Sequence, residues 1–417
     1  MQEQGPLITD DAVVFGILMA ILALVFTTSA SKNPFWVKFY KVIPSLLLCY
    51  FIPGLLNTFG LISGEESGLY TVASRYLLPA SLVLFTLSID FKGIIRLGPK
   101  ALVMFLAGTM GVIIGGPLAL FIVALLSPDV VSGTGADEVW RGLATVAGSW
   151  IGGGANQAAM LEVFGASPTL FSQMIAVDVI VANIWLAALL YGAGNADKLD
   201  KWFRADSTAI HELKDRVEKY RDSILRIPTT SDTMKILGVG FGITGLSHLI
   251  ASGIAPWIAA NYPHLDQYSL TSTFFWIVVL ATTGGLVLSF TKARDLEGVG
   301  ASRFGSVLLY VLVATIGMQM DLMAIFDNPT LFMVGIVWIL IHVTIMIVVA
   351  YFIRAPFFFI AVGSQANVGG AASAPIVATA FHPALAPVGV LLAVLGYALG
   401  TYGAYICGLF LQWVFHL

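Results

Sequence analysis

Two glycine-rich stretches, each inside a long apolar segment, contain the residue types best suited to bind a small ligand. Their sequences are GSWIGGGANQAAM at residues 148–160 and GSQANVGGAASAP at residues 363–375. Glycine lets a helix unwind, after which the freed N–H groups of a half-helix bind anions and the freed carbonyls bind Na⁺. We therefore predict a solute site formed by Ser149, Gly153, Gly154, Asn156, Gln157, Ser364, Gln365, Asn367, Gly369, Gly370 and Ser373.

The side-chain amides in these stretches favour a ligand site over simple helix packing. Glycine and alanine also allow two helices to approach closely, so the same stretches suit a helix–helix contact without a ligand. Asn156, Gln157, Gln365 and Asn367 would, however, be costly to bury in a dry seam or against lipid. We interpret them as groups that face a ligand or an ion.

Asp178 is the acidic residue best suited to bind a coupling ion. It lies in the middle of the apolar run MIAVDVIVANIW, and an ionisable side chain at that depth is a functional candidate because its burial is costly. It would complete a Na⁺ site with oxygens from Asn156 and Asn183, or it would carry a proton. A structural carboxylate that accepts hydrogen bonds from a broken helix is the alternative.

The last apolar segment has no acid that corresponds to Asp178. Thr401 offers an oxygen ligand for the coupling ion there, and Tyr397, Tyr402 and Tyr405 would bond an organic solute or lie at the membrane interface. This divergence suits one half that binds the ion and another that binds the solute.

Four other polar residues have simpler interpretations. Asp90 precedes the basic loop 92–100, which predicts an interfacial ion pair, and Asp321 ends a segment that resembles the one ending at Asp90. Glu162 follows the first glycine stretch and is either a gate residue or a helix-end charge. His342 is expected to be a hydrogen-bonded structural residue and is left out of the site.

Composition places the chain in a membrane. Of its 417 residues 58% are apolar and 11% charged, against about a quarter charged in soluble domains. A formal net charge of −3 leaves no basic surface for nucleic acid, and the two cysteines cannot form a disulfide framework. The expected partners are the lipid bilayer and a small solute, without nucleic acid.

The chain is predicted to consist of two related membrane halves. Its twelve apolar segments include residues 141–164 and 355–380, which contain the glycine stretches. The stretch 73–76 resembles 301–304, and the two glycine stretches recur at a similar offset. We predict a first repeat at 1–193, an amphipathic linker at 194–230 and a second repeat at 231–417.

The positive-inside rule predicts the topology of these halves. If both glycine-rich segments are re-entrant, the N-terminus lies outside, the linker lies in the cytoplasm, and 19 of the 21 Lys and Arg residues are cytoplasmic. The expected fold is all-α and polytopic, with two inverted repeats, about ten crossing helices and two glycine-rich re-entrant or broken helices. A version in which both broken helices span the membrane remains open.

The glycine cluster Gly148-Ser149-Trp150-Ile151-Gly152-Gly153-Gly154-Ala155-Asn156-Gln157 resembles a bacterial family catalogued as domain of unknown function 819, over nearly the whole chain. That family is placed with cation:proton antiporters and with bile-acid, glutamate and citrate symporters. The resemblance implies inverted repeats, interrupted helices that meet at the membrane centre, an elevator mechanism and a homodimer. Gly153-Gly154 and Gly369-Gly370 are similar to the paired glycines of the citrate-type members.

These observations together predict a secondary active transporter of a bacterial inner membrane. It would use Na⁺ or H⁺ to take up a small carboxylate-bearing solute, with no other cofactor, and it would not be an enzyme. The carboxylate is expected because two helix N-termini suit one or two negative charges. Na⁺/H⁺ exchange is the alternative within the transporter class, and a membrane scaffold or an intramembrane enzyme is the alternative outside it.

Overall fold

The structure is a computed structural model that describes residues 6–64, 66–203, 205, 228–320, 328–382 and 385–417. Regular structure in these residues is helical, apart from an isolated bridge between Ile8 and Ile62. Most of the predicted amphipathic linker and the predicted segment end at Asp321 lie outside the described residues. The described start of the linker forms the short helix α10 (Ala196–Phe203).

Seven helices of the described chain are long and apolar enough to cross a membrane. The remaining predicted crossings correspond to α3 and α13, which are each bent sharply against a neighbouring helix, and to the 17-residue α14. The protein is therefore an all-α multi-pass membrane protein, as its composition predicts. The count of ten crossings and the inverted relation of the halves stay predictions.

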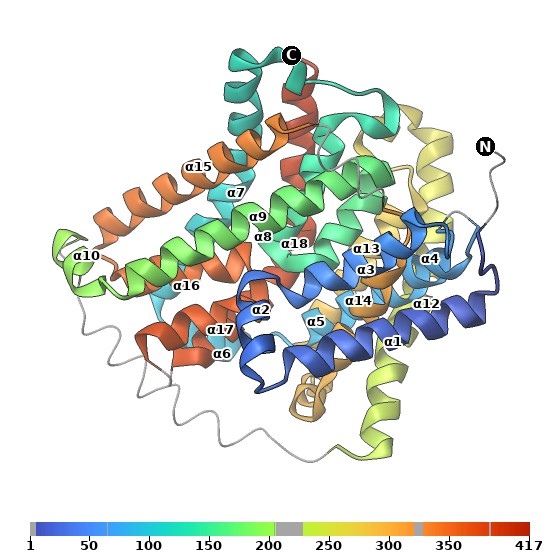
Figure 1. Cartoon of the computed structure of the whole chain (residues 1–417), viewed down its shortest axis with the longest axis horizontal. Helices are drawn as coiled ribbons and strands as arrows, with labels where there is room; N and C mark the ends of the chain where they lie inside the picture. Colours follow the sequence, from blue (N-terminus) through green and yellow to red (C-terminus); the bar gives the residue numbers. More distant parts are fainter. Residues whose placement is uncertain (1–5, 65, 204, 206–227, 321–327, 383–384) are drawn as a thin grey trace.

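The helices form two bundles, each built from both halves of the chain (Figure 1). The first, here called the lateral bundle, contains α1 (Asp11–Ser29), α3 (Ser45–Thr58), α5 (Leu78–Leu87), α12 (Thr230–Asn261), α13 (Thr273–Leu288) and α14 (Ala301–Gly317). The second, here called the hairpin bundle, contains α7 (Pro99–Leu126), α8 (Val139–Phe164), α9 (Pro168–Ala193), α15 (Thr330–Ile353), α16 (Phe357–Val368), α17 (Gly370–Phe381) and α18 (Ala386–Phe415).

Short helices complete both bundles. Helix α2 (Pro34–Val42) precedes α3, and α4 (Leu69–Val72) continues through a π-helical turn at Ala73–Leu77 into α5. Helix α6 (Phe91–Arg96) leads from the lateral bundle into α7. The bundles meet where α5 and α13 pack against α8 and α18.

Helix α8 doubles back on itself at Gly153 and forms a re-entrant hairpin, called hairpin 1. Gly153 has φ 73° and ψ −176°, a backbone conformation essentially restricted to glycine. The rings of Trp140 and Phe164, from the two ends of α8, lie 5.4 Å apart, whereas a straight helix would separate them by about 36 Å. A left-handed Gly165 and the Ser167 cap of α9 then direct the chain out of the hairpin.

Helices α16 and α17 form a second re-entrant hairpin, called hairpin 2. They join at Gly369 and Gly370, and Gly370 has a φ of 59°. Phe357 at the start of α16 and Phe381 at the end of α17 have ring centroids 6.2 Å apart. The structure therefore resolves the open alternative between re-entrant and spanning broken helices in favour of re-entrant hairpins.

The two hairpins enter from opposite ends of α18, and their tips meet at its middle. A Cβ atom placed on Gly389 would meet Ala374 of hairpin 2, and one on Gly408 would meet Phe164 of hairpin 1. Gly396 lies between these two glycines on α18. A Cβ atom placed on it would lie 2.7 Å from the Ile151 carbonyl oxygen and 3.6 Å from the Ala366 carbonyl oxygen. Hairpin arms of 11–14 residues are roughly 16–21 Å long, about half the thickness of a bilayer.

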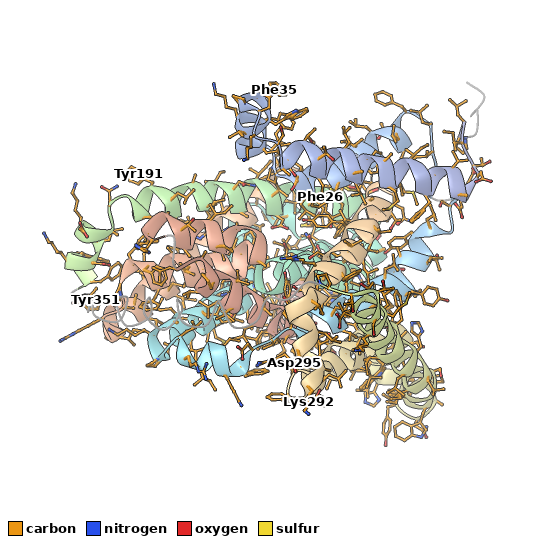
Figure 2. All side chains as sticks on the ribbon, turned by 90° about the horizontal axis from the view of Figure 1, so that it is seen from below. Phe26, Phe35, Tyr191, Lys292, Asp295 and Tyr351 are labelled. Atoms are coloured by element: carbon orange, nitrogen blue, oxygen red, sulfur yellow. The ribbon has the colours of Figure 1, made fainter. Side chains whose placement is uncertain are left out.

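The opening of hairpin 2 lies beside the start of the linker. The Phe357 amide donates to the Asp200 carboxylate at 2.7 Å, and Lys100 donates to the Arg354 carbonyl at 3.3 Å. At this end of the hairpin bundle, Tyr191 of α9 and Tyr351 of α15 project outward (Figure 2). Basic residues and exposed tyrosines at one end are typical of a membrane interface, and which interface faces the cytoplasm stays a prediction.

Candidate functional site at the hairpin tips

Asp178 lies among hydrogen-bond donors supplied by hairpin 1. Trp150 Nε1 donates to its Oδ1 at 2.6 Å, and Gln157 Nε2 donates to its Oδ2 at 3.1 Å. The side chain of Ser149 lies beside this carboxyl group. Trp150 belongs to the first arm of the hairpin and Gln157 to the second, so the carboxylate of α9 joins both arms near the tip. These two hydrogen bonds leave about two of its four lone-pair positions for other partners.

Asn156 belongs to a different set of bonds from Asp178. Its Nδ2 donates to the carbonyl oxygens of Gly152 at 3.0 Å and Tyr397 at 2.9 Å, and its Oδ1 accepts from the Thr401 hydroxyl at 2.6 Å. Thr401 in turn lies 3.1 Å from the hydroxyl of Thr282 on α13. Asn156 and Thr401 thus fasten hairpin 1 to α18, and Thr282 extends the contact to the lateral bundle.

The structure assembles only part of the predicted ion site. Asp178 is bonded to Gln157, which was predicted to contact solute, rather than to Asn156. Asn183 donates to the carbonyl of Val179 on its own helix at 2.7 Å. In the described residues no group of three or more His, Cys, Asp or Glu side chains could hold a metal ion. A cation at Asp178 would therefore depend on neutral oxygens for its other ligands.

Gln365 marks the tip of hairpin 2. Its Nε2 lies 2.7 Å from the Ser373 hydroxyl across the glycine turn, but its Oε1 is buried without a hydrogen-bond partner in the described structure. A Cβ on Gly369 would overlap both Gln365 and Ser373, so glycine is required where these side chains meet. Because the amide group can turn over about its terminal bond, one end of this amide is free either to accept or to donate a hydrogen bond.

Asn367 repeats the bonding pattern of Asn156. Its Nδ2 donates to the carbonyls of Gly363, four residues earlier, and Phe105, and its Oδ1 accepts from Thr109 at 2.8 Å. Asn156 likewise bonds a glycine carbonyl four residues earlier, and its two partners on α18, like those of Asn367 on α7, are four residues apart. Both asparagines therefore position the hairpins, and their described bonds use both donor hydrogens of each amide.

His342 was left out of the predicted site but lies against hairpin 2. Its Nδ1 lies 3.0 Å from the Gly108 carbonyl, and its Nε2 lies 2.8 Å from the Ser364 hydroxyl, which also accepts from Trp185 at 2.8 Å. A carbonyl can only accept, so Nδ1 carries the proton and Ser364 donates to Nε2 in the neutral ring. The signal available in the sequence was the match of Ser364 to Ser149, since each serine lies beside a titratable residue of a neighbouring helix.

The other singled-out acids lie away from the tips. Asp90 forms an ion pair with Arg294 of the second half at 2.5 Å. Glu162 pairs with Arg75 at 3.2 Å and bonds Tyr70, so Arg75 has an ionic partner. Tyr70 and Glu162 line a cavity of about 240 Å³ at the opening of hairpin 1, where the two bundles meet.

Comparison with known proteins agrees with a membrane protein. The uncharacterized membrane protein YjcL of Bacillus subtilis (strain 168) is 23% identical to the chain over 344 residues, which cover 81% of this chain and 82% of YjcL. The family model described as protein of unknown function (DUF819) matches residues 16–414, from within α1 almost to the end of α18. Since that match covers nearly the whole sequence, the protein belongs to the DUF819 family, as the glycine cluster predicts.

Proposed function

We propose that this protein is a secondary active transporter that couples Na⁺ or H⁺ at Asp178 to the movement of a small carboxylate-bearing solute at hairpin 2. The observation that carries the proposal is the meeting of both hairpin tips at the middle of α18. Two half-helices then begin near the bilayer centre, where their N–H groups attract an anion. Irregular backbone at that depth is costly unless it serves a cavity or a ligand.

The different chemistry of the two tips supports separate positions for ion and solute. The carboxylate of Asp178 bonds Gln157 in the first turn of the second arm of hairpin 1, so that helix end already has an anion. Residues 328–417 contain no Asp or Glu, so neither hairpin 2 nor α18 supplies a carboxylate of its own. The free end of the Gln365 amide and the N-terminus of α17 together suit a carboxylate from solution.

The arrangement of the bundles supports an elevator mechanism. The hairpin bundle holds both tips and Asp178, whereas the lateral bundle packs on it through α5 and α13. Hydroxyl pairs cross this boundary, including Thr283 with Tyr402 at 2.7 Å, and such contacts can be exchanged for similar ones when one bundle slides. In this proposal the lateral bundle stays fixed in a homodimer in the bacterial inner membrane, with the linker in the cytoplasm.

The alternative functions explain fewer of the residues in the site. Na⁺/H⁺ exchange would use Asp178 but would leave the free amide atom of Gln365 without a role. An intramembrane enzyme needs at least two convergent catalytic groups, and the described neighbours of Asp178 are hydrogen-bond donors. We therefore propose transport without covalent chemistry and without a cofactor beyond the coupling ion.

Thermal unfolding of the detergent-purified protein in NaCl and in choline chloride at equal ionic strength tests the coupling ion. Binding to the folded state raises its apparent stability by mass action. We expect a saturable increase with Na⁺ that Asp178→Asn abolishes. Asp90→Asn, which alters an acid of the lateral bundle, is the matched control and should keep the Na⁺ response.

A pH series in choline chloride separates Na⁺ from H⁺ coupling. Proton coupling predicts a pH-dependent stability that disappears in Asp178→Asn, without any specific effect of Na⁺. If neither Na⁺ nor pH changes the stability through Asp178, the coupled-transport proposal is wrong.

A further inference from the structure

Tyr50 has a buried hydroxyl group that has no hydrogen-bond partner among the described residues. In the described structure only two buried side-chain polar atoms lack a hydrogen bond, namely Gln365 Oε1 in the predicted solute site and Tyr50 OH in α3. Tyr50 is 1% exposed. Leaving a buried hydroxyl unpaired costs about 1–3 kcal/mol, so a protein that retains one commonly has a ligand, ion or water to pair it.

The packing of α3 directs Tyr50 toward α9. A Cβ atom placed on Gly317 of α14 would lie 2.4 Å from the Tyr50 carbonyl, so the two backbones fit closely there. The Tyr50 ring meets Phe171 of α9 edge-on, with centroids 6.3 Å apart. Phe171 and Asp178 are seven residues apart, about two turns along one face of α9. The Tyr50 ring therefore packs on the face of α9 that carries Asp178.

These two groups belong to different bundles. Asp178 is in the hairpin bundle and Tyr50 in the lateral bundle, and the carboxylate has about two lone-pair positions left. An anion is disfavoured beside this carboxylate. A small alkali cation suits both groups. It binds one oxygen of the Asp178 carboxylate and takes the neutral phenol oxygen of Tyr50 as a further ligand.

We propose that Tyr50 supplies its hydroxyl oxygen to a Na⁺ ion held at Asp178, so that the ion is bound between the two bundles. This inference rests on the proposed function and adds a ligand from the opposite side of the bundle boundary. An ion bound in this way joins the hairpin bundle to the lateral bundle, so its arrival favours the arrangement in which α3 faces α9. Release of the ion frees the hairpin bundle to move.

Sodium titrations of Tyr50→Phe followed by thermal unfolding test the proposal. The variant keeps the ring and removes only the hydroxyl. We expect its stability in choline chloride to equal or exceed that of the wild type, because an unpaired buried hydroxyl is lost. We expect the Na⁺ concentration that gives half of the stabilisation to rise about tenfold, the effect of losing one ligand contact.

Tyr405→Phe is the matched control. The Tyr405 hydroxyl donates to the Tyr268 carbonyl at 2.5 Å, so its removal should lower the stability in both salts and leave the Na⁺ midpoint unchanged. A Tyr50→Phe midpoint equal to that of the wild type overturns the role of Tyr50 while leaving Asp178 as the ion site. A wild type without any Na⁺ response overturns the sodium site itself, so the two failures are distinguishable.

Discussion

The two hairpins have the same backbone design and opposite chemistry. Each reverses at a glycine, carries an asparagine bonded to the carbonyl four residues earlier, and has a serine beside a titratable residue of a neighbouring helix. In hairpin 1 that residue is Asp178, and in hairpin 2 it is His342. The comparison teaches that the backbone and asparagine contacts position the tips, whereas the residues around each tip decide which ligand it suits.

Glycine substitutions should have the largest effects and distinguish the two turns. A Cβ on Gly369 would lie 1.9 Å from the Ser373 hydroxyl oxygen, so Gly369→Ala must displace the side chains that define the tip of hairpin 2. In hairpin 1 the sensitive position is Gly153, because its φ and ψ are restricted to glycine. We expect each substitution to cost about 2–4 kcal/mol or to abolish folding, as measured by unfolding in detergent.

Gly154→Ala is the control for both variants. A Cβ there would have its nearest neighbour, Leu309, at 3.9 Å, and the backbone is helical, so we expect little change in stability. Equal losses at Gly153 and Gly154 would contradict the hairpin geometry, since a conventional helix kink does not distinguish them in this way.

Asn156 and Asn367 should contribute equally to stability, although the two hairpin tips suit different ligands. Asn156→Ala and Asn367→Ala each leave two carbonyls and one threonine hydroxyl without their amide partner. We expect each to lower the free energy of unfolding by about 2–3 kcal/mol. The Na⁺ midpoint of Asn367→Ala should stay unchanged. A loss of Na⁺ binding in Asn156→Ala beyond its loss of stability would restore Asn156 as an ion ligand and sharpen the difference between the tips.

The sequence predicts the backbone design better than the partners of each side chain. Apolar segment lengths, glycine clusters and the distribution of Lys and Arg depend on local physics, and they indicate a polytopic helical chain with two interrupted segments. The re-entrant form also follows from charge, because the basic linker must lie on one side. These features do not require knowledge of which helices pack together.

The details of the site depend on contacts between distant segments. Asn156 is a plausible cation ligand by residue type, but its partners are Tyr397 and Thr401, more than 240 positions away. His342 has an ordinary helical context and becomes part of the tip only because α15 packs beside α16. Tyr50 carries no local signal at all, since a buried tyrosine in an apolar helix is common and only its missing partner distinguishes it.

The smallest expected difference in stability between the two hairpins lies at their openings, where the chain enters each hairpin. Hairpin 2 begins at Phe357, whose amide is bonded by Asp200 of the linker helix α10, whereas the side chain of Glu138 makes no capping bond at the start of hairpin 1. Asp200→Ala should cost about 1 kcal/mol, the usual effect of losing a side-chain cap. Asp200→Asn keeps an oxygen acceptor and should cost less.

These two variants also separate the charge of Asp200 from its hydrogen bond. Burial raises the pKa of the Asp200 carboxyl group, against a smaller lowering by the Phe357 amide. The folded state therefore holds this proton more tightly than the unfolded state, and the contribution of Asp200 to stability falls as pH rises through the raised pKa. Asp200→Asn should remove that slope from the pH dependence of unfolding. An unchanged slope would mean that the linker contact does not persist in solution, and that the two hairpins open in equivalent surroundings.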